Sequence, residues 1–133
     1  MSLDLNAVMD AVGTRLATIT GLRVYDYPAE TASPPAAIVG LPSELEYDFT
    51  KGRGSDRAVI PITLLVGKVV ERSARDALSL YLAGTGASSV KAAVDGDLGG
   101  AAQTVRVMGA RVEIVTLNGV EYLGATFDLE VID

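Results

Sequence analysis

The sequence predicts an α/β (α+β) fold, with a mixed, largely antiparallel sheet, two main helices on one face and a long C-terminal β-hairpin. Two segments carry apolar residues at the three- and four-residue spacing of an amphipathic helix. Several apolar runs have the length of strands, and the last two flank an Asn118-Gly119 dipeptide that is typical of a tight turn. The 133 residues match the usual size of one domain, so we expect a single domain over residues 1–133.

The first expected element is a helix. Its apolar positions recur every three or four residues: Leu5, Val8, Met9, Val12, Leu16 and Ile19. Ser2 or Asp4 can cap its start, and Gly21 ends it. A short strand over 22–27 and a proline-rich loop over 28–35 are expected to follow.

Two further strands are expected on either side of the most polar segment of the chain. Residues 36–41 are continuously apolar and predict a buried strand, and residues 58–66 predict a strand that is apolar on both faces. Pro61 lacks one ladder donor, which places that part of the strand at an edge or a bulge. The intervening segment, 43–56, predicts a long hairpin or an exposed mobile loop.

The second main helix is expected over residues 71–82. Its apolar stripe consists of Ala74, Leu78, Tyr81 and Leu82. Residues 88–94 predict one more short helix, and residues 95–100 predict a turn.

A C-terminal hairpin is expected from strands over 104–117 and 120–132. Because both positions of a type I′ turn need positive φ, Asn118-Gly119 suits a two-residue connection, and such a turn determines the register. The predicted opposed pairs are Leu117–Val120, Ile114–Leu123, Val112–Ala125, Ala110–Phe127 and Met108–Leu129. The last four pairs are apolar and share a face, which we expect to lie under the two helices.

The other face of this hairpin changes character along its length. Near the base it is polar, with Arg111 opposite Thr126 and Asp128 within diagonal reach. Near the turn it is apolar, with Val115, Leu117, Val120 and Tyr122. Two interpretations are open: the helix over 88–94 or the 43–56 segment covers this tip, or the tip is a subunit interface.

Composition narrows the possible chemistry. The chain has no Cys and no His, which excludes disulfides, thiolate metal sites and nucleophiles activated by His. A net charge of −6 with 5% aromatic residues is poorly suited to holding nucleic acid. We therefore expect no catalytic, cofactor or metal site, and a protein that is not an enzyme.

Neither a targeting segment nor a membrane span is expected. Residues 1–10 lack a basic stretch followed by an apolar run. The longest apolar stretch, 58–67, is far too short to span a bilayer.

Three local patterns resemble functional motifs but do not meet their requirements. The glycine-rich segment 52–55 lacks the Lys-Ser/Thr ending of a phosphate loop. Residues 95–100 begin like a calcium loop, but Arg106 stands where a bidentate Glu is required. Glu44 and Glu46 lie in the most exposed segment, where nothing would raise a carboxyl pKa, so we expect them to be surface charges.

The 43–56 segment and the residue after it carry opposed charges. Glu44, Glu46 and Asp48 come first, and Lys51, Arg53 and Arg57 follow. The acidic half of one subunit could pair with the basic half of its neighbour, or the segment could pair with itself as a hairpin.

The final run, Leu117-Asn118-Gly119-Val120-Glu121-Tyr122-Leu123-Gly124-Ala125-Thr126-Phe127-Asp128-Leu129-Glu130-Val131, resembles the C-terminus of tail terminator proteins of long-tailed bacteriophages. The length, the helical N-terminus and the Pro-interrupted strand over 59–67 resemble that family as well. The resemblance covers most of the chain and consists of a turn, aromatic positions and element order.

The resemblance implies a structural virion protein. Members have helices packed on a mixed sheet and form a ring, usually a hexamer, on the end of the tail tube. The ring stops tube polymerisation and provides the surface that joins the head. The implied partners are other copies of the chain, the tail tube protein and the head–tail connector protein, with DNA only as cargo passing through the lumen. The implied location is the head-proximal end of the virion tail, after assembly in the host cytoplasm.

On this reading the polar segment contacts the tube or the neighbouring subunit. The residues expected to do so are Glu44, Glu46, Tyr47, Asp48, Phe49, Lys51, Arg53 and Arg57. A polar loop with two aromatic side chains is suited to folding against a partner.

Other functions fit the same residues. The nearest is a head–tail connector or tail-completion ring, followed by the tail tube subunit. A small-ligand-binding regulatory α/β dimer would need convergent polar groups in a pocket, which the pattern does not place together. An enzyme is the least expected class.

Overall fold

The computed structural model describes residues 4–19, 21–25, 35–47, 56–70, 72–86, 88–95, 104–117 and 119–132. In these ranges the elements are α1 (Leu5–Leu16), β1 (Arg23–Tyr25), β2 (Ala36–Val39), β3 (Glu44–Glu46), β4 (Arg57–Lys68), α2 (Arg72–Leu82), α3 (Val90–Val94), β5 (Thr104–Leu117) and β6 (Val120–Ile132).

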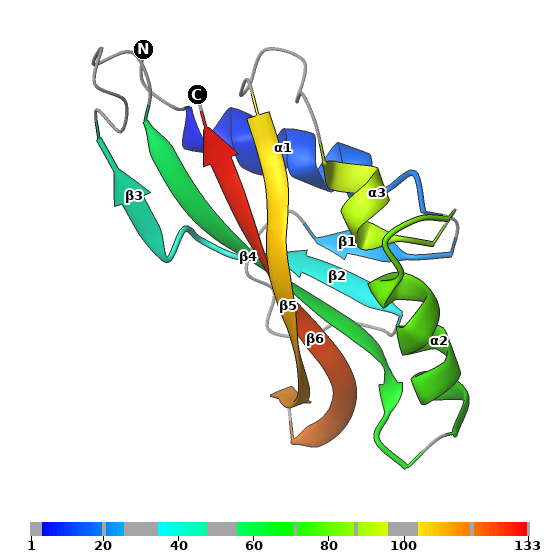
Figure 1. Ribbon diagram of the computed structural model, residues 1–133. Helices are drawn as coiled ribbons and strands as arrows, with labels where there is room; N and C mark the ends of the chain where they lie inside the picture. Colours follow the sequence, from blue (N-terminus) through cyan, green and yellow to red (C-terminus); the bar gives the residue numbers. More distant parts are fainter. Residues whose placement is uncertain are drawn as a thin grey trace.

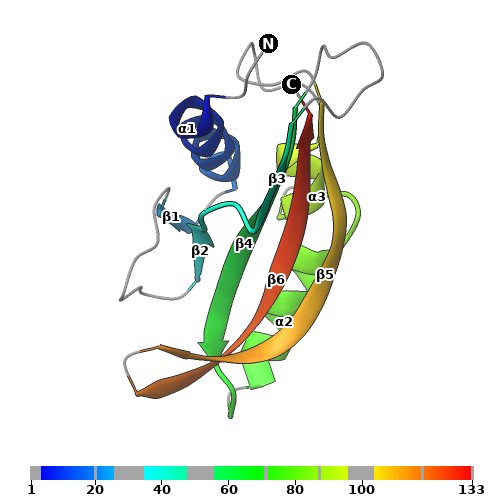
Figure 2. The ribbon, with the colours of Figure 1, turned by 90° about the vertical axis from the view of Figure 1, so that its left-hand side faces the viewer.

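The described strands form one six-stranded sheet in the order β1-β2-β4-β6-β5, and β3 pairs with β4 beside the end of β2. The β1–β2 pair is parallel, and the other pairs are antiparallel. The helices lie together on one face of this sheet (Figures 1 and 2). The predicted fold class is therefore confirmed, including the long C-terminal hairpin.

The core lies between the helices and the sheet face that they cover. Its largest contributions from the helices are Val8, Val12, Leu16, Leu78, Tyr81, Val90 and Val94. The sheet contributes Ala37, Val39, Ile60, Ile62, Leu64, Val105, Ala125, Phe127, Leu129 and Val131. Burial of these apolar side chains is the main favourable contribution to folding.

Helix α1 begins and ends at definable signals. Asp4 is its N-cap, and the Asp4 carboxylate accepts a hydrogen bond from the Ala7 N–H at 3.3 Å. The helix ends at Leu16, earlier than the apolar spacing predicts, although Ile19 still lies in the core with 2% exposure. The alternative cap, Ser2, lies outside the described residues.

Strand β4 is buried on both faces, as predicted. Register places Ile60, Ile62 and Leu64 on the helix-covered face, whereas Val59 and Leu65 lie on the opposite face and are 7% and 0% exposed. A strand buried on both faces is an interior strand, and β4 pairs with β2 and β3 on one side and β6 on the other.

The prediction that Pro61 lies at an edge or a bulge is wrong. Pro61 stands opposite Asp128 in the β4–β6 ladder, away from the irregularity between Leu65 and Gly67. Its carbonyl accepts a hydrogen bond from the Gly40 N–H at 2.8 Å, so its backbone faces away from β6. On that side the β2 ladder ends at Val39 and the β3 ladder begins beside Val59. An interior strand tolerates proline here because its missing donor faces the break between β2 and β3.

The hairpin register is confirmed from the turn as far as Ala110 and wrong beyond it. The observed pairs include Leu117–Val120, Ile114–Leu123, Val112–Ala125 and Ala110–Phe127. Val107, not Met108, opposes Leu129, and Gly109 opposes Asp128. Met108 is the extra residue of a β-bulge, which shifts the pairing by one residue.

The expectation that the whole apolar face of the hairpin lies under the helices is also wrong. Val112 and Ile114 are 58% and 56% exposed. Helix α2 packs over β4 and β6, so the helix layer stops short of the distal part of β5.

Gly124 allows the two central strands to approach each other closely. It pairs with Leu65, next to the irregularity between Leu65 and Gly67 in β4. A β-carbon at position 124 would overlap the backbone carbonyl oxygen of Leu64. Since backbone on an interior strand cannot move away without disturbing the ladder, a side chain here is incompatible with the observed packing.

We expect Gly124→Ala to lower the free energy of unfolding by about 1–3 kcal/mol, because overpacking forces backbone shifts of that cost. Urea unfolding followed by circular dichroism measures the change. Gly109→Ala is the matched control in the same hairpin, since no atom lies within 4 Å of its added β-carbon. Equal stability of the two variants would contradict the close approach.

Candidate interaction surfaces

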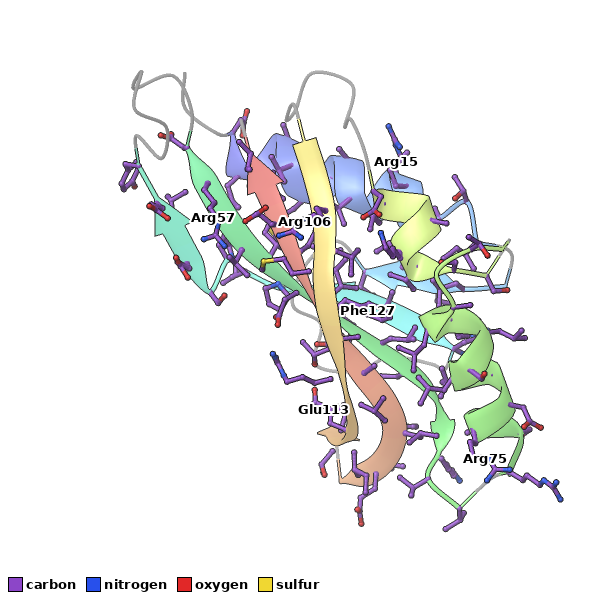
Figure 3. All side chains as sticks on the ribbon, in the orientation of Figure 1. Arg15, Arg57, Arg75, Arg106, Glu113 and Phe127 are labelled. Carbon is purple, nitrogen blue, oxygen red and sulfur yellow. The ribbon has the colours of Figure 1, made fainter. Side chains whose placement is uncertain are left out.

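The sheet face without helices is covered with charged side chains. Cross-strand partners share a face, so the register brings together residues from β3, β4, β5 and β6. We define the charged face as Glu44, Glu46, Arg57, Arg106, Arg111, Glu113, Asp128 and Glu130. Arg57 and Arg106 lie on this side of the sheet, whereas Phe127 points toward the helices (Figure 3).

Arg57 is the centre of this network. Its Nε donates to Glu130 Oε2 at 2.7 Å, and its side chain and that of Glu130 are only 16% and 15% exposed. The same guanidinium reaches Glu44 at 3.2 Å and Glu46 at 3.8 Å on β3. Glu130 also lies 3.5 Å from Arg106. Arg57 thus links β3, β4 and β6 through charge-assisted contacts.

The electrostatics of the central pair follow from this geometry. The hydrogen bond from Arg57 lowers the pKa of Glu130 below its ordinary value of 4.5, against the opposing effect of burial. The same bond raises the pKa of Arg57. Both side chains are therefore charged at neutral pH.

The distal half of the charged face is more exposed. Arg111 donates to Asp128 Oδ2 at 2.7 Å, with 64% and 31% of the two side chains exposed. Thr126 donates its hydroxyl hydrogen to Glu113. Exposed pairs of this kind contribute little to stability, so their charges are available to a partner.

The structure describes half of the predicted partner-binding segment. Glu44, Glu46, Tyr47 and Arg57 are in place, whereas Asp48, Phe49, Lys51 and Arg53 lie outside the described residues. Strands β3 and β4 form a hairpin, which is one of the two predicted conformations. Arg57 pairs with the glutamates of its own hairpin, as the self-pairing interpretation of these charges requires.

The predicted subunit interface at the hairpin tip is partly covered. Val115, Val120 and Tyr122 are half-buried, and the side chain of Leu117 lies outside the described residues. Strand β3 lies at the other end of the hairpin. In Figures 1 and 2 the ribbon at the tip of the hairpin curls out of line with the rest of the sheet. A role in subunit contact remains a prediction.

A second surface was predicted from the sequence only in part, through Tyr47. Leu5, Leu41, Leu45 and Tyr47 are 37%, 60%, 44% and 69% exposed. We call them the end patch. Leu5 and Leu45 border a small apolar hollow between α1 and the β3–β4 hairpin, lined also by Val8, Pro42, Ala58 and Ile60. Helical spacing assigns Leu5 to the core, and only the Glu-Leu-Glu alternation of β3 signals that Leu45 faces away from its charged neighbours.

Two other kinds of feature are absent from the described residues. Among the residues that the structure describes, no group of three or more carboxylates is placed to hold a metal ion. None of the described helices is long and apolar enough to cross a membrane.

We expect Arg57→Leu to lower the free energy of unfolding at pH 7 by about 1.5–3 kcal/mol, because it removes a charge-assisted hydrogen bond from half-buried Glu130. The folded-state pKa of Glu130 is depressed, so the contribution of the pair is fully present above about pH 4.5. It is lost as pH falls through the folded pKa. Denaturant unfolding at pH 7 and at steps down to pH 3 measures both effects.

Arg106→Gln is the control for this prediction. Arg106 contacts the same carboxylate at 3.5 Å but is 59% exposed, so its loss changes the stability little. The assigned pairing would be contradicted if the free energy of unfolding of Arg57→Leu fell with decreasing pH as steeply as that of the unchanged protein.

In comparisons with known proteins, no family model matches the chain and no curated protein matches it.

Proposed function

We propose that this protein is a tail terminator: a structural virion protein that forms a ring on the end of a phage tail tube, halts its growth and provides the surface that joins the head. The fold supports the proposal. The family resemblance implies helices packed on a mixed sheet, and the chain has such a sheet with its helices on one face.

The single observation that carries the proposal is the end patch. Leu5 on α1 and Leu45 on β3 stay exposed at the rim of an apolar hollow, and Leu41 and Tyr47 are exposed on the chain segment around Leu45, which runs into the predicted partner loop. Exposed apolar groups gathered in one place mark a protein–protein contact. We assign this surface to contact with the tube end.

The charge of the chain is consistent with a ring that DNA must pass. The net charge is −6, and the charged face has more carboxylates than arginines. A surface of this sign does not retain phosphate.

The test adds purified protein to uncapped tail tubes assembled from the tube protein of the same phage, viewed by negative-stain electron microscopy. We expect rings on one end of each tube. The double variant Leu45→Ser and Tyr47→Ala removes apolar area from the end patch, and we expect it to lower tube-end occupancy at least tenfold at equal concentration.

The control is Leu80→Ser, which removes the same kind of side chain, 62% exposed, from α2. It should cap tubes normally, and circular dichroism should show that all variants are folded. Absence of the unchanged protein from tube ends would contradict the proposal, and binding to the portal end of heads would identify a connector instead.

A further inference from the structure

Strand β5 has a free edge. It is the last strand of the sheet, and no described element lies beyond its middle and distal parts (Figure 2). Long unpaired edges are templates for pairing with another chain. Strand β5 carries charged side chains on one face and the exposed Val112 and Ile114 on the other. This pattern restricts which strand could pair with the edge.

The usable part of the edge begins after the bulge in β5. Val107 donates its N–H to Asp95 Oδ1 at 2.9 Å, so that backbone group is already occupied. The bulge at Met108 comes next. From Gly109 to Leu117 the strand runs in regular register with β6, and Val112 lies inside this stretch.

Alternation along this stretch decides which backbone groups face outward. The Val107 N–H points away from β6, toward Asp95. Gly109 pairs with Asp128 after the bulge, where the extra residue Met108 shifts the alternation by one, so the Gly109 backbone groups face β6. Within 109–115 the outward N–H and C=O groups therefore belong to Ala110, Val112 and Ile114.

We propose that two copies of the free protein pair through the 109–115 edge of β5, antiparallel and centred on Val112. Ala110 then opposes Ile114 of the second copy, and the two Val112 residues oppose each other. These pairs use the outward backbone groups of Ala110, Val112 and Ile114 and form about six hydrogen bonds between the chains. Val112 and Ile114, both more than half exposed in the single chain, become neighbours across the contact.

The charges of Arg111 and Glu113 favour the register that is centred on Val112. If the two copies are related by a twofold axis perpendicular to the sheet, the charged faces of both copies lie on the same side of the joined sheet. The axis then passes through a position where one residue opposes its own copy. Centring on Val112 opposes Arg111 to Glu113 of the second copy, twice. Centring one residue earlier opposes Arg111 to itself, and one residue later opposes Glu113 to itself. Like charges directly opposite destabilise a strand pair.

The side chains are well placed for this pairing. Arg111 and Glu113 would form a non-hydrogen-bonded pair, where opposed Cα atoms approach to about 4.5 Å and side chains are closest. Arg111 is 64% exposed and uses one nitrogen for Asp128, so the rest of its guanidinium can reach the second copy.

This contact goes beyond the proposed function. An isologous contact satisfies both partners and closes at two, whereas a ring requires head-to-tail contacts. The pair is therefore a state of the free subunit that covers its exposed edge and separates before assembly. Its test needs only the purified protein, so the result is independent of the test on tail tubes.

The test reverses the charge at position 111 or 113 and measures dimerisation by sedimentation equilibrium. Arg111→Glu and Glu113→Arg each oppose like charges twice, and we expect each to raise the dimer dissociation constant at least tenfold. An equimolar mixture of the two variants restores both opposed pairs, so we expect heterodimers of near-normal affinity. Arg75→Glu, the same charge change on the exposed side of α2, should dimerise normally.

Single cysteines test the register without altering charge, because the chain has no cysteine of its own. Val112→Cys should form a disulfide-linked dimer on oxidation, since opposed Cα atoms lie about 5.5 Å apart. Ile114→Cys should not, because its copies are offset by four residues, roughly 13 Å. A monomer at all concentrations, a mixture that fails to pair, or crosslinking at position 114 instead of 112 would each overturn the proposal.

Discussion

The antiparallel ladder between β4 and β6 is the interaction on which the other contacts depend. It runs from the Arg57–Ile132 pair to the Lys68–Tyr122 pair, and every other described strand except β1 pairs with one of its two members. Its helix-covered face supplies most of the apolar side chains on the sheet side of the core. Gly124 lets the two backbones approach, and the Arg57–Glu130 pair joins them at the other end of the ladder. The ladder therefore positions both the core side chains and the residues of the candidate surfaces.

The candidate surfaces exist because the helices cover only one face of the sheet, and only part of the width of that face. The opposite face keeps its charges, because no described helix packs on it. Where α2 stops short of β5, Val112 and Ile114 are left exposed at the free edge. At the other end, α1 and the β3–β4 hairpin leave an apolar hollow between them. A protein that works by contact needs such surfaces more than it needs a deep pocket.

The features predicted well are those with local causes. The two-residue connection at Gly119, which has φ +81°, sets the register as far as Ala110, and helical spacing finds the buried faces of α1 and α2. The errors have non-local causes. The bulge at Met108 follows Val107, whose N–H is bound by Asp95 at the end of α3, and the tolerance for Pro61 depends on where two other strands end. Periodicity identifies the apolar face of β5 but not how far a helix extends over it, so the exposure of Val112 and Ile114 was missed.

The candidate surfaces divide in the same way. The charges of Glu44, Glu46 and Arg57 could be identified from the sequence, but their convergence with Glu130 required knowing that β3 and β6 flank β4. The end patch joins Leu5 to Leu45, which lie far apart in the chain and meet only in the fold.

Termination of tube growth is the central claim, and polymerisation kinetics test it most directly. Purified tail tube protein would be assembled with increasing, substoichiometric amounts of this protein, and light scattering would follow tube mass while electron microscopy measures tube length. Capping predicts that growth stops early and that mean length falls as the number of available rings rises. Tubes of unchanged length at every ratio would contradict it.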